Sequence, residues 1–222
     1  MELTWLPLVA SLLVTLTSLA LLITADWRVS ILLLSIQYLG VFLLVSTHWP
    51  IGMAIAKLIA GWMTGAVLGM GILSVPELRQ TLTSRFIVRR VSSALPASPQ
   101  INVRPATQRL AVGRNFFLAG ALLVGLAIFS RLSTFSHWIP GIASEQAWAG
   151  LILIGLGLLK LGFSGQPLHI ILGLLTALSG FEILYAWVES GIPVAGLLAG
   201  VNLVLALAGA YLMVAPYMEE AE

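Results

Sequence analysis

Long apolar runs, separated by short polar or proline-containing breaks, dominate the sequence. A transmembrane helix needs about 20 predominantly apolar residues to cross roughly 30 Å of hydrocarbon. Seven runs meet this requirement, at residues 3–25, 29–47, 51–74, 115–132, 147–164, 168–188 and 193–214. Breaks such as Ser164-Gly165-Gln166-Pro167 place a proline where a new helix would begin. The sequence therefore predicts an all-α polytopic membrane protein with about seven transmembrane helices in a three-plus-four arrangement.

The composition indicates that most of the protein surface faces lipid and not water. Of the 222 residues, 59% are hydrophobic and only 9% are charged, whereas a soluble domain carries about 25% charged residues. The chain contains no cysteine, so it cannot supply thiolate ligands to zinc or to an iron–sulfur cluster. We therefore expect no cofactor in this chain, and any redox cofactor would belong to a partner.

The first apolar run is expected to be a retained span rather than a signal peptide. It begins at Leu3 with no Lys or Arg ahead of it, and no small-residue cleavage site follows a short apolar stretch. The sidedness is predicted by the basic residues. Seven of the eleven lie between residues 75 and 114, and loops rich in Lys and Arg stay in the cytoplasm. This places the N-terminus outside and, with seven spans, the C-terminus inside.

The basic segment divides the chain into three expected parts. Residues 1–74 would form a three-helix membrane bundle, residues 75–114 a cytoplasmic segment, and residues 115–222 a four-helix bundle. The segment begins with an apolar stripe at helical spacing, as in a helix lying in the headgroup region, and continues into a linker with three prolines at 94–107. Beside membrane spans, anionic lipid or a partner subunit explains its arginines better than nucleic acid does. The docking candidates are Arg79, Arg85, Arg89 and Arg90.

Ionisable residues inside apolar runs are functional hypotheses, because burying a charge in hydrocarbon is costly. Glu182 lies past the middle of the run at 168–188, and its short side chain cannot easily reach water. It is either a proton- or ion-carrying carboxylate or a structural hydrogen-bonding group. Lys57 lies about two turns into the run at 51–74. It could face a hydrated path or a partner helix, or extend toward the outer interface.

Three further residues are candidates for proton translocation. Lys160 lies near the cytoplasmic end of its run, where a lysine is commonly an anchor. His169 lies one turn into the next run and could relay protons, although it could equally be an interfacial residue. Glu189 follows Glu182 by seven positions, so on a continuous helix both carboxylates would project from one face. Glu189 could also be an ordinary loop residue.

The remaining polar residues in the spans are Gln37 and Asn202, which could join such a path or only bind helices together. Small-residue patterns at 61–69 and 196–200 indicate close helix packing, within the chain or with a neighbour. The sequence contains no nucleophile motif, phosphate-binding glycine loop or metal-ligand cluster. Catalysis by this chain alone is therefore not expected.

The last three runs resemble the NuoK-like small subunits of respiratory complex I. Related proteins are MrpC of multisubunit cation/proton antiporters and the E component of hydrogenase-four-type membrane-bound hydrogenases, which is nearest in size. The resemblance covers residues 147–214. It rests on a glycine-bearing helix that ends in a basic or polar turn, followed by a helix with a glycine and then a buried glutamate. The matching residues are Gly155, Lys160, Gly173, Gly180 and Glu182.

The resemblance implies a small membrane-arm subunit of an ion-translocating respiratory complex, beside a larger antiporter-like subunit in a bacterial or archaeal cytoplasmic membrane. Glu182 would be the central proton carrier, with Lys57, Lys160 and His169 as partners that relay protons or tune its pKa. The family pattern has a second buried glutamate on its last helix, where this chain offers only Asn202. This difference leaves open a purely structural role. A structural or assembly subunit of another membrane complex and a stand-alone small transporter remain alternative interpretations.

Overall fold

A computed structural model describes residues 5–24, 26–74 and 144–219. These residues form six helices, each long and apolar enough to cross a membrane. The helices are α1 (Leu6–Ile23), α2 (Trp27–Val45), α3 (Ile51–Ser74), α6 (Ser144–Phe163), α7 (Pro167–Val188) and α8 (Ile192–Glu219). The described part is therefore all-helical and membrane-spanning in character, as predicted. The expected span at 115–132 lies outside the described residues.

The helix ends follow local sequence signals. Asp26 caps α2, because its carboxylate accepts a hydrogen bond of 3.0 Å from the backbone N–H of Arg28. Pro167 occupies the first position of α7, where its missing N–H has no cost. The expected limits of these helices are matched within a few residues, and α3 coincides with 51–74. Only α8 is clearly longer than expected, since it continues through Pro216.

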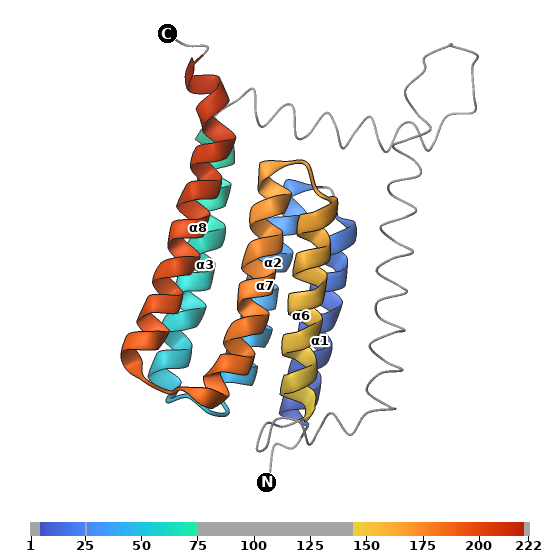
Figure 1. The fold of residues 1–222 in the computed structure, drawn as a ribbon, viewed down its shortest axis with the longest axis vertical. Coiled ribbons are helices and arrows are strands. Elements are labelled where there is room, and N and C mark those ends of the chain that lie inside the picture. Colours follow the sequence, from blue (N-terminus) through green and yellow to red (C-terminus); the bar gives the residue numbers. More distant parts are fainter. Residues whose placement is uncertain (1–4, 25, 75–143, 220–222) are drawn as a thin grey trace, which may run out of the picture.

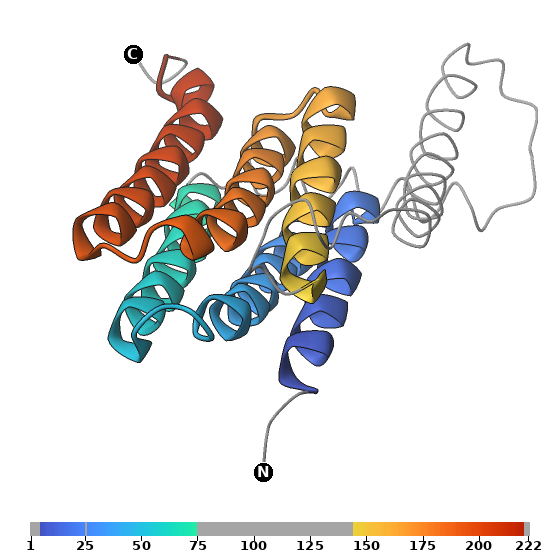
Figure 2. The ribbon, with the colours of Figure 1, turned by 60° about the horizontal axis from the view of Figure 1, so that its bottom comes forward.

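The six helices form two layers of three. The first layer holds α1, α2 and α3, and the second holds α6, α7 and α8. Figures 1 and 2 show the two layers face to face, with α1 against α6, α2 against α7 and α3 against α8. We call the end of the bundle where α1 begins the N-face. The opposite end, where α1 finishes, is the C-face.

Glycines bring the backbones of α6 and α7 into direct contact. A Cβ atom added to Gly157 would lie 2.5 Å from the backbone nitrogen of Ala177, and one added to Gly180 would lie 2.5 Å from the carbonyl oxygen of Gly150. Gly61 of α3 likewise receives the ring of Tyr38 from α2. By contrast, no described atom lies within 4 Å of a Cβ added to Gly196 or Gly200.

The core contains two apolar clusters at different depths. The C-face cluster includes Leu34 of α2, Leu175 of α7 and Ala206 of α8. The N-face cluster includes Val41 of α2, Ile183 of α7 and Leu198 of α8. Buried polar side chains lie between the two clusters along these helices. We call this set the polar layer, and its members are Gln37, Lys57, Thr176, Ser179, Glu182 and Asn202, together with the hydroxyl of Tyr38, whose ring belongs to the C-face cluster.

Candidate functional site: a buried ion pair between the layers

The centre of the polar layer is an ion pair between Lys57 of α3 and Glu182 of α7. The Lys57 ammonium donates a hydrogen bond to Oε1 of Glu182. The two side chains are 3% and 1% exposed, so neither reaches the surface of the bundle. A buried charge is tolerated when it is paired and hydrogen-bonded. Lys57 and Glu182 provide each other with both an opposite charge and a hydrogen bond. Lys57 therefore does not extend to the outer interface.

Asn202 of α8 and Tyr38 of α2 complete the contacts around the pair. The side-chain nitrogen of Asn202 donates to Oε1 of Glu182 at 3.2 Å. The hydroxyl of Tyr38 lies 3.5 Å from Oδ1 of Asn202 and donates to it. The Lys57 ammonium lies 5.9 Å from the centre of the Tyr38 ring, within the range of a cation–π contact. Four helices from both layers thus contribute to this site, with α2 reaching the carboxylate only through Asn202.

The two oxygens of the Glu182 carboxylate have different surroundings. Oε1 accepts hydrogen bonds from Lys57 and Asn202, whereas Oε2 is buried without a hydrogen-bond partner. Gln37 of α2 is 1% exposed, and neither its side-chain nitrogen nor its oxygen has a partner. A carboxylate held on one oxygen and open on the other can take up and release a proton while its position is maintained.

Lys160 lies apart from this pair, at the C-face. Its side chain is only 3% exposed, and the ammonium donates to the carbonyl oxygen of Leu21 in the last turn of α1. Carbonyl groups at a helix C-terminus lack an intrahelical donor and carry partial negative charge. Lys160 therefore caps α1 across the layer interface instead of anchoring at an exposed surface.

Glu189 does not share a helix face with Glu182, contrary to the expectation from their spacing. The reason is that α7 ends at Val188, and Glu189 follows with an extended backbone. Its carboxylate turns back onto its own loop and accepts a hydrogen bond of 2.9 Å from the N–H of Gly191. His169 is half-buried in the first turn of α7, at the opposite face. Neither residue contacts the ion pair.

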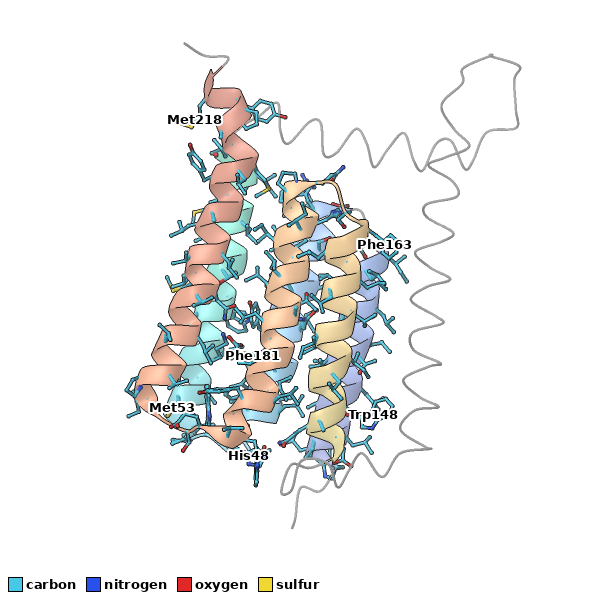
Figure 3. All side chains as sticks on the ribbon, viewed as in Figure 1. His48, Met53, Trp148, Phe163, Phe181 and Met218 are labelled. Carbon is cyan, nitrogen blue, oxygen red and sulfur yellow. The ribbon has the colours of Figure 1, made fainter. Side chains whose placement is uncertain are left out.

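A second polar cluster, at the N-face, was not anticipated from the sequence. The side-chain nitrogen of Gln146 in α6 donates to the carbonyl of Leu44 at 3.1 Å and to the hydroxyl of Thr47. Its oxygen lies 2.7 Å from Nε2 of His48, and the His48 ring packs edge-on against Trp187. Figure 3 shows His48 at this face, near Met53 at the start of α3.

Tyr38 was also missed, because an aromatic residue in an apolar run is usually part of the core. One available signal was the small residue Gly61, which marks a place where a large side chain from another helix can enter. The four docking arginines, at positions 79, 85, 89 and 90, lie outside the described residues. Within the described ranges, no group of three or more histidine and acidic residues could hold a metal ion.

No known protein family, curated protein or solved structure matches the chain.

Proposed function

We propose that the chain is a small membrane-arm subunit of an ion-translocating respiratory complex of the complex I, membrane-bound hydrogenase or Mrp antiporter type, in which Glu182 carries a proton. The observation that supports this most strongly is the Lys57–Glu182 pair, which is buried between the two layers of apolar helices, six residues from the start of α3 and six from the end of α7. Ionisable groups in this position are costly and are typical of proton and ion pathways.

The chemistry of the pair suits reversible proton transfer. A proton moving from the Lys57 ammonium to Oε1 of Glu182 would travel along an existing hydrogen bond. The products are a neutral amine and a neutral carboxylic acid, which an apolar environment tolerates better than two separate charges. The proton and the charges balance within the pair, so the transfer adds no net charge to the interior.

The resembled family has a second buried glutamate on its last helix, where this chain offers only Asn202. An amide neither gains nor loses a proton at neutral pH, so Asn202 cannot be the next carrier. In this chain the ionisable partner is Lys57, which comes from the first layer instead of the last helix. We propose that Asn202 orients the carboxylate by holding Oε1 at 3.2 Å.

We further propose seven spans, with the N-face outside the cell. Gln146, at the start of α6, contacts Leu44 and Thr47 beside the start of α3. The end of α3 and the start of α6 therefore lie at opposite faces of the bundle. This arrangement supports one additional span, which we place at 115–132. The cytoplasmic position of the basic segment at 75–114 is proposed from its seven basic residues.

The proposed partners are a larger antiporter-like membrane subunit and anionic lipid, in a bacterial or archaeal cytoplasmic membrane. The test is to extract the chain gently from native membranes with a C-terminal tag and to identify bound proteins by mass spectrometry. Recovery with antiporter-like and iron–sulfur subunits is the expected result. Recovery alone or as a homo-oligomer would contradict the proposal and favour a stand-alone transporter.

A structural or assembly subunit is the second candidate. It is favoured by the Lys160–Leu21, Gln146–Leu44 and Trp49–Glu189 contacts, which join the two layers without proton chemistry. Replacing Arg79, Arg85, Arg89 and Arg90 together separates the two functions. Lost assembly with intact ion translocation by the remaining complex would favour docking as the main role.

A further inference from the structure

Gln37 is the most unusual polar residue of the core, because its whole side-chain amide is buried without a partner. Its nitrogen and oxygen both lack a hydrogen bond, and the side chain is 1% exposed. A buried polar group without a partner is costly, because it has lost its hydrogen bonds to water. Native proteins avoid this cost by hydrogen-bonding nearly all such groups to protein or to ordered water. The amide therefore indicates a bound hydrogen-bonding molecule.

The helix positions around Gln37 show what it faces. Leu34, Gln37 and Val41 lie on one stripe of α2, because residues three and four apart share a helix face. Leu34 belongs to the C-face cluster with Leu175 of α7, and Val41 belongs to the N-face cluster with Ile183 of α7. Gln37 lies between them on α2, which packs against α7, so we infer that its side chain lies level with the stretch of α7 between Leu175 and Ile183.

That stretch of α7 contains three buried polar side chains, and only one of them is unsatisfied. The hydroxyls of Thr176 and Ser179 donate to carbonyl oxygens of their own helix, at 2.7 and 2.8 Å. Glu182 keeps Oε2 without a partner. Gln37 and Oε2 of Glu182 thus present one unsatisfied donor and two unsatisfied acceptors within the same part of the polar layer.

We propose that Gln37 and Glu182 bind internal water between α2 and α7. Water fits because it both accepts and donates: it can accept from the Gln37 nitrogen and donate to the Gln37 oxygen and to Oε2 of Glu182. A cation would leave the Gln37 nitrogen without an acceptor. An apolar molecule would leave the Gln37 nitrogen, the Gln37 oxygen and Oε2 of Glu182 all without a hydrogen bond. The two apolar clusters lie on either side of the site along the helices, so they separate the water from both faces.

The bound water gives Glu182 a second proton partner, on the oxygen opposite Lys57. This functional meaning rests on the proposed function, whereas the water site itself rests only on the unsatisfied atoms. When Glu182 is protonated, its proton can reside on Oε2 and be donated in a hydrogen bond to the water, while Oε1 keeps its bond to Lys57. Gln37 is thus a positioning residue, which acts on Glu182 through the water.

The test is water-edited solid-state NMR on the full chain in lipid bilayers, with ¹³C-labelled glutamate, glutamine and isoleucine. We expect polarisation from water to reach the side-chain carboxyl carbon of Glu182 and the amide carbon of Gln37 well before the methyl carbons of Ile183. The Glu182 signal is assigned by its disappearance in Glu182→Gln. If the Glu182 signal of the wild-type chain grows no faster than the Ile183 signal, the proposal is overturned, and no variant is needed for this result.

The Gln37→Met variant keeps the length of the side chain and removes its polar atoms, and we expect it to lose most of the transfer to Glu182. Thr176→Val is the matched control, because Thr176 is buried beside the same stretch but is satisfied by its own helix. It should leave the transfer unchanged. Transfer to Glu182 that persists in Gln37→Met would contradict the assignment of Gln37. Both measurements are independent of ion translocation and of partner subunits.

Discussion

Lys57 and Glu182 lie 125 positions apart in the chain and form an ion pair inside a bundle of apolar helices. The pair joins the two layers, because α3 belongs to the first and α7 to the second. The same residues therefore serve two purposes that can be separated experimentally. One is to hold the layers together, and the other is to hold a transferable proton.

Breaking the pair from one side should destabilise the bundle. Lys57→Met leaves a buried carboxylate without its cation, and the loss of one partner of a buried pair costs about 3–5 kcal/mol. The double variant Lys57→Met/Glu182→Leu replaces both charges with apolar groups and should recover most of that loss. Thermal unfolding in detergent measures the stability of the wild type, of Lys57→Met and of the double variant. A double variant no more stable than Lys57→Met would show that the pair is not the reason for the loss.

The glycine contacts between α6 and α7 should be intolerant of even one methyl group. In Gly157→Ala the new Cβ meets backbone atoms of α7, which cannot rotate away, so the helices must separate. Overpacking of this kind costs about 1–3 kcal/mol. Gly196→Ala is the control, since no described atom lies within 4 Å of its Cβ. Equal melting temperatures for the two variants would contradict the close approach of the two backbones.

Gln146 should stabilise the N-face by joining α6 to the end of α2. Gln146→Met removes the donor to Leu44 and the acceptor for His48, and we expect a loss of about 1–3 kcal/mol in the free energy of unfolding. Gln166→Met is a suitable control, because Gln166 precedes α7 without a side-chain capping bond. If Gln166→Met is destabilised as much as Gln146→Met, the Gln146 cluster is not a specific stabilising contact between α6 and α2.

The same cluster predicts the tautomer of His48. The Leu44 carbonyl can only accept a hydrogen bond, so the Gln146 amide must direct its nitrogen to Leu44 and its oxygen to His48. Nε2 of His48 then carries a hydrogen in the neutral ring. Nitrogen-15 NMR distinguishes the two tautomers. A neutral ring protonated at Nδ1 would contradict this hydrogen-bond arrangement.

Lys160→Met tests whether the second buried lysine has a structural role. The change removes the donor to the Leu21 carbonyl, so we expect a loss of stability of about 1–3 kcal/mol while ion translocation is retained. Thermal unfolding and transport by the assembled complex are the measurements. Transport that is lost from a stable Lys160→Met complex would instead place Lys160 among the proton carriers.

The fold was largely predictable because its signals are local. Apolar length, Asp26 as a cap and Pro167 at a first helical position each depend on neighbouring residues only. The pairing of the layers was not predictable, because it depends on where distant residues meet. Gly157 and Gly180 look like any membrane glycines in the sequence, and only their positions opposite the backbone of the partner helix reveal the contact between α6 and α7.

Apart from Tyr38, the residues of the candidate site were predictable, but their pairing was not. Glu182, Lys57, Asn202 and Gln37 are conspicuous because polar groups are rare in apolar runs. Their distances could not be inferred, since Lys57 could equally have reached the interface. The misplacement of Glu189 has a local cause, because a helical spacing rule holds only while the helix continues, and α7 ends at Val188.

The central claim, that the carboxylate of Glu182 carries a proton, is tested most directly by Glu182→Gln in native membranes. The amide keeps the size of the side chain and can still accept hydrogen bonds from Lys57 and Asn202 on its oxygen, but it cannot bind a proton. Ion translocation should be followed together with assembly of the complex. We predict an assembled complex that has lost most of its translocation. An assembled Glu182→Gln complex that translocates ions at the wild-type rate would contradict the claim.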